Sequence, residues 1–173
     1  YEITKLGAIL LGKNLDEFEE VGRKAVRVIG YKGKNKIDTI REQIGKRGYA
    51  VGFEGLIDWI NGQLPANEEI GRAFRSETRM YPEIAIRELV ANAIIHQDFS
   101  EKGFPMIEIF SDRIEISNPG IPLITPQRFI DEYVSRNERL ADVLRRFGMC
   151  EEKGSGIDKV IFYNEMYQLP AVD

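Results

Sequence analysis

The sequence predicts an α+β fold, a two-layer α/β sandwich in which a mixed, mostly antiparallel sheet is covered by helices. Residues 82–100 are apolar on nearly all sides at about 100° per residue, which predicts a helix inside the core. Residues 105–110 and 113–117 alternate around the two-residue turn Ser111-Asp112, which predicts a hairpin. Residues 25–29 are β-branched and lead into a glycine-lysine turn, which predicts a third strand.

The first half of the chain predicts further, weaker elements. They are a buried strand or short helix over 4–11, a loop or single helical turn over 16–21, a marginal helix over 38–46, a helix over 53–64 stopped by Pro65, and a strand over 69–80. Pro82 then suits the first turn of the central helix, where its missing N–H does no harm.

The last third predicts helices separated by glycine and proline breaks. Asn118-Pro119-Gly120-Ile121-Pro122 interrupts the chain, and Thr125 caps a helix that begins at Pro126. A helix over 140–147 ends at Gly148. Gly154-Ser155-Gly156 opens the last helix, where Ser155 and Asp158 have the spacing of a capping box.

The composition is that of an ordinary globular domain. The 173 residues are 43% hydrophobic and 30% charged. No apolar run approaches the roughly 18 residues of a membrane span. Cys150 has no disulfide partner within the chain, which favours a reducing cytoplasm. Because the chain starts without methionine and ends abruptly, we interpret 1–173 as one domain of a longer protein, with strands and a helix in 1–80 and the motifs described below in 81–173.

The net charge of −4 argues against a surface that binds nucleic acid throughout, yet residues 1–50 carry +4 and the remainder −8. The basic side chains cluster at Arg23, Lys24, Arg27, Lys32, Lys34 and Lys36. Two interpretations stay open. The cluster is a solvated turn after a strand, or it is a phosphate-contacting ridge that assists a DNA-binding domain elsewhere.

Glu88, Asn92 and His96 recur at steps of four along the apolar central helix. Buried polar groups are costly unless they are paired or face a cavity, so this strip is the leading candidate for a binding site. A carboxylate near a terminal phosphate polarises the attacking water, and an amide oxygen one turn away suits Mg²⁺. The alternatives are a Glu–Asn pair that only bonds neighbouring backbone, and a structural histidine.

Three other motifs carry weaker signals. Asn118-Pro119-Gly120 is a strong turn signal with or without a ligand. Glycines before a helix, as in Gly154-Ser155-Gly156, allow backbone N–H groups to approach an anion, but they also serve as a simple cap. Arg136, in Ser135-Arg136-Asn137, clamps a phosphate or forms a surface ion pair with Glu132 or Glu138. The spacing of Cys, His and Ser suggests neither a zinc site nor a hydrolase triad.

The segment ELVANA followed by His96 resembles the N-box of the gyrase, histidine-kinase and MutL group of ATP-binding domains, the GHKL or Bergerat fold. Together, EIAIRELVANAIIHQDFS, DRIEISNPGIP and SRNERLADVLRRFGMCEEKGSGID resemble a divergent branch of that group. Its bacterial and archaeal members are known as transcriptional regulators or "RecG-related helicases". The resemblance is strong over residues 81–160 and weaker over 1–80.

The resemblance implies ATP and Mg²⁺ as cofactors and gives each motif a role. Glu88 would be the catalytic base, Asn92 the magnesium ligand, and His96 part of the phosphate-side wall. Asn118 stands where active relatives have the aspartate that accepts from adenine, Gly120 stands at the first glycine, and Pro122 at the second. Gly154, Ser155 and Gly156 would form the lid over the phosphates, with Arg136 as a further phosphate contact.

The first functional hypothesis is an ATP-binding regulatory domain of a DNA-binding transcriptional regulator. By resemblance, Schlafen/AlbA-like and winged-helix domains outside this chain would bind the DNA, and occupancy would be conveyed through a homodimer. The alternatives are a degenerate structural or dimerisation module without ligand, and a slow Mg²⁺-dependent ATPase. A true helicase is not expected, because the sequence lacks the P-loop GxxxxGK[ST].

Overall fold

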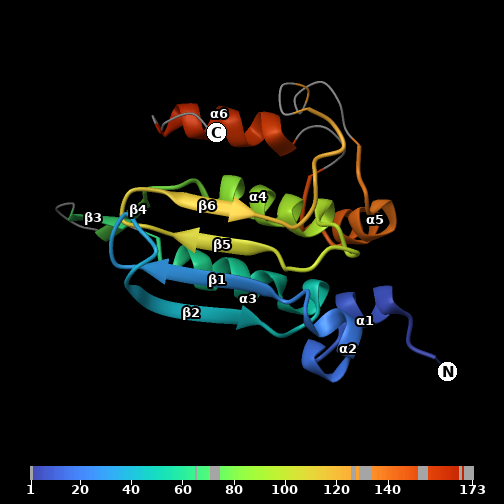
Figure 1. Ribbon diagram of the computed structural model, residues 1–173. Helices are drawn as coiled ribbons and strands as arrows, with labels where there is room; N and C mark the ends of the chain where they lie inside the picture. The colour runs from blue at the N-terminus through green and yellow to red at the C-terminus, as the bar shows by residue number, and fades with distance from the viewer. Residues whose placement is uncertain are drawn as a thin grey trace.

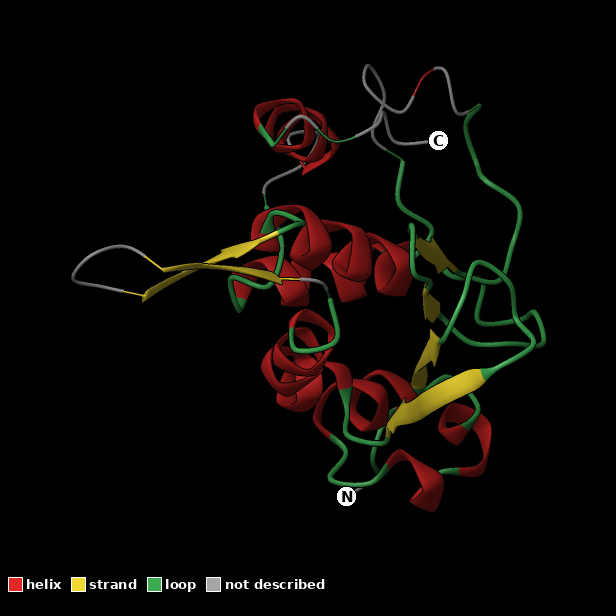
Figure 2. Ribbon diagram, turned by 90° about the vertical axis from the view of Figure 1, so that its left-hand side faces the viewer, coloured by secondary structure: helices red, strands yellow, loops and turns green. Residues whose placement is uncertain are grey.

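The computed structural model describes residues 2–64, 66–70, 75–125, 128, 134–151, 156–167 and 169. Its main sheet has the order β2-β1-β5-β6 and consists of β1 (Val26–Tyr31), β2 (Thr39–Gly45), β5 (Met106–Ile109) and β6 (Ile114–Ser117). Strands β1 and β5 are parallel, and the other two pairings are antiparallel. The helices lie on one face of this sheet (Figures 1 and 2). The predicted α+β sandwich with a mixed, mostly antiparallel sheet is therefore confirmed.

The core lies between the sheet and two long helices. These are α3 (Tyr49–Asn61) and α4 (Glu83–His96). The buried apolar side chains of the sheet include Val26, Val28, Ile107 and Ile109, and those facing them include Phe53, Ile57, Ile86, Val90 and Ile94. Apolar side chains at alternate positions of β1 and β5 thus place one side of these two strands in the core.

The central helix α4 is buried on most of its circumference, as its sequence predicts. It packs against the sheet and α3 on one side and against α5 (Glu138–Arg146) and α6 (Gly156–Met166) on the other (Figure 2). Pro82 is its N-cap, one residue before the predicted position. None of the helices within the described ranges combines the length and hydrophobicity that a membrane crossing needs.

The N-terminal segment is helical. Of the alternatives given above, residues 4–11 therefore contain a short helix and not a strand, and residues 16–21 are helical and not a loop. Helix α1 (Lys5–Leu11) is capped by Thr4, whose hydroxyl accepts from the Gly7 N–H at 3.0 Å. A short 3₁₀ turn, η1 (Leu15–Glu17), and α2 (Glu19–Gly22) follow. Helices α1 and α2 lie at the lower right of Figure 1, beside the right-hand ends of β1 and β2.

Two predictions for the first half of the chain were wrong. Residues 38–46 contain strand β2 and not a helix, because six of its seven residues pair antiparallel with β1 and this non-local pairing overrides the helical spacing of the isoleucines. The single strand over 69–80 is instead two strands, β3 (Ala66–Ile70) and β4 (Arg75–Arg79), which pair as an arm projecting from the body (Figure 2).

The remaining differences concern boundaries. Helix α3 starts at Tyr49, four residues before the predicted start, and α5 starts at Glu138. The hairpin of β5 and β6 is confirmed, and so is the stop at Gly148, whose φ is +67°. The predicted helix start at Pro126 and the Ser155 cap lie outside the described residues.

A buried polar network anchors the C-terminal end of α4. The Gln97 side chain, which is fully buried, donates from Nε2 to the Tyr49 hydroxyl at 2.9 Å and to the Ile94 carbonyl at 3.0 Å. The Tyr49 hydroxyl in turn donates to the Lys24 carbonyl at 2.6 Å. Asn137 Nδ2 donates at 2.7 Å to the carbonyls of both Ile95 and Gln97, which satisfies the last turn of the helix. These bonds fix the helix end that carries the predicted site.

Candidate functional site

A cavity of about 450 Å³ opens beside the polar strip of α4. Seven of the nine predicted site residues line it: Glu88, Asn92, His96, Asn118, Gly120, Arg136 and Gly156. The other two, Gly154 and Ser155, lie outside the described residues. The polar strip of α4 therefore faces the cavity and not packed protein. Segments that are distant in sequence meet around the cavity: α4, residues 116–124, and residues from 134 onward.

Glu88 is a buried part of this wall, with 3% of its surface exposed. Its Oε1 accepts from the Glu151 N–H at 2.8 Å. A Cβ placed on Gly156 would lie 2.6 Å from Glu88 Oε2, so the first residue of α6 approaches the carboxylate as only glycine permits. The carboxylate is thus held between α6 and the segment after α5.

Burial raises the pKa of Glu88 above its ordinary value, and the hydrogen bond from the Glu151 N–H partly opposes that shift. The negative charge of Glu151 raises the pKa further, while Lys159 lowers it. A carboxyl with a raised pKa is better matched to accepting a proton near neutral pH than an exposed one. The geometry and the pKa direction both suit a general base.

Glu88→Gln is expected to stabilise the protein increasingly as the pH rises. Folding raises the pKa of Glu88 above 4.5, so the folded state binds this proton more tightly than the unfolded state. Deprotonation of Glu88 therefore costs stability progressively above about pH 4.5, a cost that glutamine does not carry. Urea unfolding of both proteins between pH 4 and 8 measures the difference. A difference independent of pH would contradict the prediction.

The other two members of the strip are half-buried. The pKa of His96 is lowered by burial and by the positive charge of Arg136, which favours the neutral imidazole. Asn92 presents an amide one turn from Glu88 in the same wall. Among the described residues, no group of three or more His, Cys, Asp and Glu side chains could hold a metal ion. The amide oxygen of Asn92 is nevertheless a ligand type that suits Mg²⁺, which keeps several waters and is held in part by substrate phosphates.

The Asn118–Gly120 turn forms another part of the cavity wall. Gly120 has φ +116°, and a Cβ there would lie 2.7 Å from Arg136 Nη1 and 2.8 Å from Asp98 Cβ. The Pro119 carbonyl accepts from the Asp98 N–H at 2.7 Å, which ties the turn to the end of α4. Asn118 lines the cavity and makes one long hydrogen bond, from Nδ2 to the Pro119 carbonyl at 3.4 Å. Glycine is therefore required at 120 by the backbone and by close packing.

Arg136 faces the cavity, and its ion-pair partner is Asp98. The second nitrogen, Nη2, donates to the Ile121 carbonyl at 2.7 Å. Of the two acids named from the sequence, Glu138 is not this partner, and Glu132 lies outside the described residues. The spacing could not reveal Asp98, because the two residues are 38 positions apart and meet only through the fold.

Sequence reasoning also missed Glu151, Arg145 and Cys150, which line the same cavity. Glu151 contributes a backbone N–H, a group every residue but proline has, so its side chain gave no signal. The half-buried Cys150 has a thiol pKa raised to about 11, chiefly by burial. This thiol is protonated at neutral pH and is not an activated nucleophile.

The basic cluster of residues 23–36 is largely engaged within the protein. Lys34 pairs with Asp112 at 3.4 Å, Lys36 with Glu108 at 2.7 Å, and Arg27 with Glu42 at 3.2 Å. Lys24 is buried, and its Nζ donates to the carbonyls of Asp98 and Glu101. Because these cations already have partners inside the protein, the contacts favour the first interpretation, a solvated turn after a strand, over a phosphate-contacting ridge.

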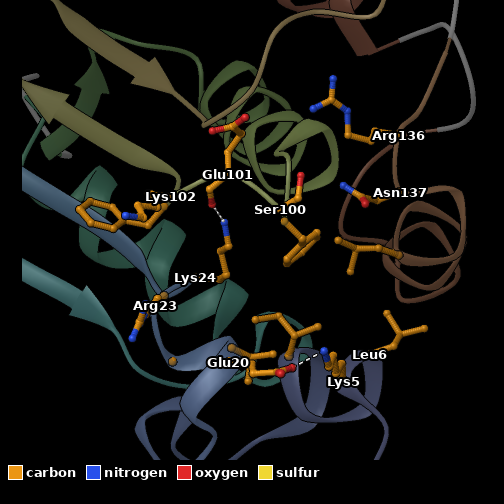
Figure 3. A pocket seen from close by; sticks show the side chains of 18 of the residues that line it. Lys5, Leu6, Glu20, Arg23, Lys24, Ser100, Glu101, Lys102, Arg136 and Asn137 are labelled. Carbon is orange, nitrogen blue, oxygen red and sulfur yellow. Dashed lines mark hydrogen bonds and ion pairs between the residues drawn. The ribbon is translucent and has the colours of Figure 1, made fainter.

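An open groove of about 1500 Å³ lies on the other side of the loop that follows α4 (Figure 3). Lys24, Ser100 and Glu101 line it, together with residues of α1 and α2. Arg136 lines both the groove and the 450 Å³ cavity. Figure 3 shows its guanidinium directed away from Lys24.

Together, the fold and the cavity define an α+β domain with a ligand-sized pocket. Residues 103–173 match a family model described as "Putative ATP-dependent DNA helicase recG C-terminal", an ATPase-like domain. The match covers less than half of the chain and contains Asn118, Gly120, Arg136 and Gly156, whereas α4 precedes it. This part of the chain is thus similar to a nucleotide-binding type of domain.

The chain is also similar to a solved structure, that of the DIP2311 protein from Corynebacterium diphtheriae. The TM-score is 0.73 at 18% sequence identity, and the similarity covers 91% of this chain. The chain spans only about a third of that protein, 32% of its length. At this identity the likeness establishes the shared fold alone. No curated protein matches the chain.

Proposed function

We propose that this chain is a nucleotide-binding regulatory domain that takes ATP with Mg²⁺. The observation that carries the proposal is the cavity of about 450 Å³ around which Glu88, Asn92, Asn118 and Arg136 converge. Pockets for small ligands typically have volumes of about 300–1000 Å³ and combine apolar walls with a few polar groups. The apolar lining includes Leu89, Ile116, Ile121, Leu123 and Ile157.

The polar residues fit the parts of such a ligand. Asn92 offers a hard oxygen ligand for the Mg²⁺ that accompanies the phosphates, and Glu88 is placed one turn away as the base. The guanidinium of Arg136 and the N-terminus of α6 at Gly156 favour negative charge. The amide of Asn118 offers both a donor and an acceptor to a base. Bound Mg²⁺ would neutralise phosphate charge, while these side chains orient the ligand and exclude water.

Isothermal titration with ATP and Mg²⁺ tests the proposal directly. We expect saturable heat and a thermal shift, because a ligand at one hundred times its Kd stabilises the folded state by about 2.7 kcal/mol. ADP and GTP serve as comparison ligands for the phosphate and the base. Absence of heat and of a thermal shift with every nucleotide would refute the proposal.

The regulatory part of the proposal is that nucleotide occupancy is conveyed to DNA-binding domains of a transcriptional regulator through a homodimer. The DNA helicase description of the matched family supports an association with DNA. The fraction of the DIP2311 chain that this domain spans is compatible with further domains. The DNA affinity of the full-length protein with and without ATP tests this part.

A degenerate structural module is the second candidate, because Glu88 and Arg136 already have partners inside the protein. In that case the cavity takes no nucleotide, and its polar wall contributes only to stability. A slow Mg²⁺-dependent ATPase would need Glu88 to release its contact with Glu151 and polarise a water. Phosphate release that is unchanged in Glu88→Ala would exclude the ATPase.

A further inference from the structure

The guanidinium of Arg136 is neutralised by an acid that the cavity itself does not include. Nη1 donates to Asp98 Oδ2, and the two side chains are only 21% and 25% exposed. The other half of the guanidinium is occupied by the Ile121 carbonyl at 2.7 Å. An anion that approaches Arg136 therefore meets a cation already paired with a carboxylate.

Asp98 is held in place by its neighbours. Its Oδ1 accepts from the Ser100 N–H at 2.9 Å and from the Ser100 hydroxyl at 2.5 Å. These hydrogen bonds, together with the charges of Arg136 and Lys24, keep the pKa of Asp98 below its ordinary value. On the groove side, Lys24 Nζ donates to the Asp98 carbonyl at 3.1 Å. It also donates to the Glu101 carbonyl at 2.7 Å (Figure 3). The carboxylate is thus a fixed negative charge beside Arg136.

We propose that Asp98 is a specificity-determining residue that competes with the phosphate groups of the ligand for Arg136. This inference rests on the proposed function, because it concerns the anionic end of the same cavity. A guanidinium binds carboxylate and phosphate through the same fork of N–H donors, so the two anions are alternatives. A polyphosphate carries several negative charges and replaces the carboxylate of Asp98 as the partner of the Arg136 guanidinium. A neutral nucleoside gains no binding energy from Arg136.

The test titrates inorganic tripolyphosphate into the wild type, Asp98→Asn and Arg136→Gln, and adenosine into the same proteins. Asparagine keeps the oxygen that accepts from Ser100, and it replaces the oxygen that faces Arg136 by an amide NH2, which carries no charge and cannot accept from the guanidinium. We expect Asp98→Asn to bind tripolyphosphate roughly three- to tenfold more tightly than the wild type. Arg136→Gln should lose this binding, and the adenosine affinity should be the same in all three proteins.

Two matched variants separate competition from structural effects. Asp58→Asn on α3 makes the same change in net charge away from the cavity lining, and should not tighten binding. Ser100→Ala removes the hydroxyl contact to Asp98 but keeps the charge of Asp98. Asp98 should still compete for Arg136, so this variant should not bind tripolyphosphate more tightly than the wild type. Asp98→Ser repeats the test should the asparagine variant fold poorly, as judged by thermal unfolding.

Tripolyphosphate affinity that is equal or weaker in both Asp98 variants would overturn the inference, since a purely structural Asp98 predicts a loss. Absence of tripolyphosphate binding in every protein would overturn it as well. The proposed function fails separately: tighter tripolyphosphate binding by Asp98→Asn without any binding of ATP would retain the competition and refute nucleotide recognition.

Discussion

Replacing Gly120 by alanine is expected to lower the free energy of unfolding by about 3 kcal/mol, the sum of a strained backbone and an overpacked contact. The φ of +116° is a conformation that side chains rarely adopt, and the new Cβ would lie 2.7 Å from Arg136 Nη1 and 2.8 Å from Asp98 Cβ. Because both neighbours are tied by an ion pair, neither can move without losing it. Urea unfolding monitored by circular dichroism measures the loss.

Gly55→Ala is the matched control for this prediction. Gly55 lies in the middle of α3, and a Cβ there meets nothing within 4 Å. Alanine in an exposed helical position gains roughly 0.5–1 kcal/mol over glycine, so the control should shift stability in the opposite direction. Equal effects of the two substitutions would show that the close approach at Gly120 does not constrain the turn.

The parts of the fold that the sequence predicts best are those with strong local periodicity. Residues 82–100 predict an apolar helix, and α4 begins one residue after the predicted start and ends four residues before the predicted end, at His96. The hairpin of β5 and β6 follows from alternation around a two-residue turn. Strand β2 was missed because its pairing with β1 is non-local and because its exposed edge carries little apolar alternation.

The candidate site was predictable as a list of residues but not as a set of contacts. Steps of four placed Glu88, Asn92 and His96 on one strip, and the structure adds the cavity beside it. Asp98 and Glu151 act through an ion pair and a backbone N–H to segments 38 and 63 residues away. Such contacts depend on how α5 and α6 return to α4, which local spacing does not encode.

Asn92→Ala is expected to weaken ATP binding in the presence of Mg²⁺ by roughly ten- to a hundredfold, since a hydrogen bond or ligand to a charged group contributes about 1.5–3 kcal/mol. Asn92 is half-buried in the cavity wall, and its side chain makes no described contact that folding requires. Alanine also favours a helix more than asparagine does, so stability without ligand should be unchanged or higher. Titration with ATP in Mg²⁺ and in EDTA measures the effect.

The comparison with EDTA decides which role Asn92 has. If its amide holds Mg²⁺, the difference between wild type and Asn92→Ala should shrink when the metal is removed. Asn164→Ala is the matched control, because Asn164 is a half-buried asparagine on α6 that does not line the cavity. Loss of stability with unchanged ATP affinity would instead assign Asn92 to the structural module, and an equal loss in EDTA would place its contact on the nucleotide and not on the metal.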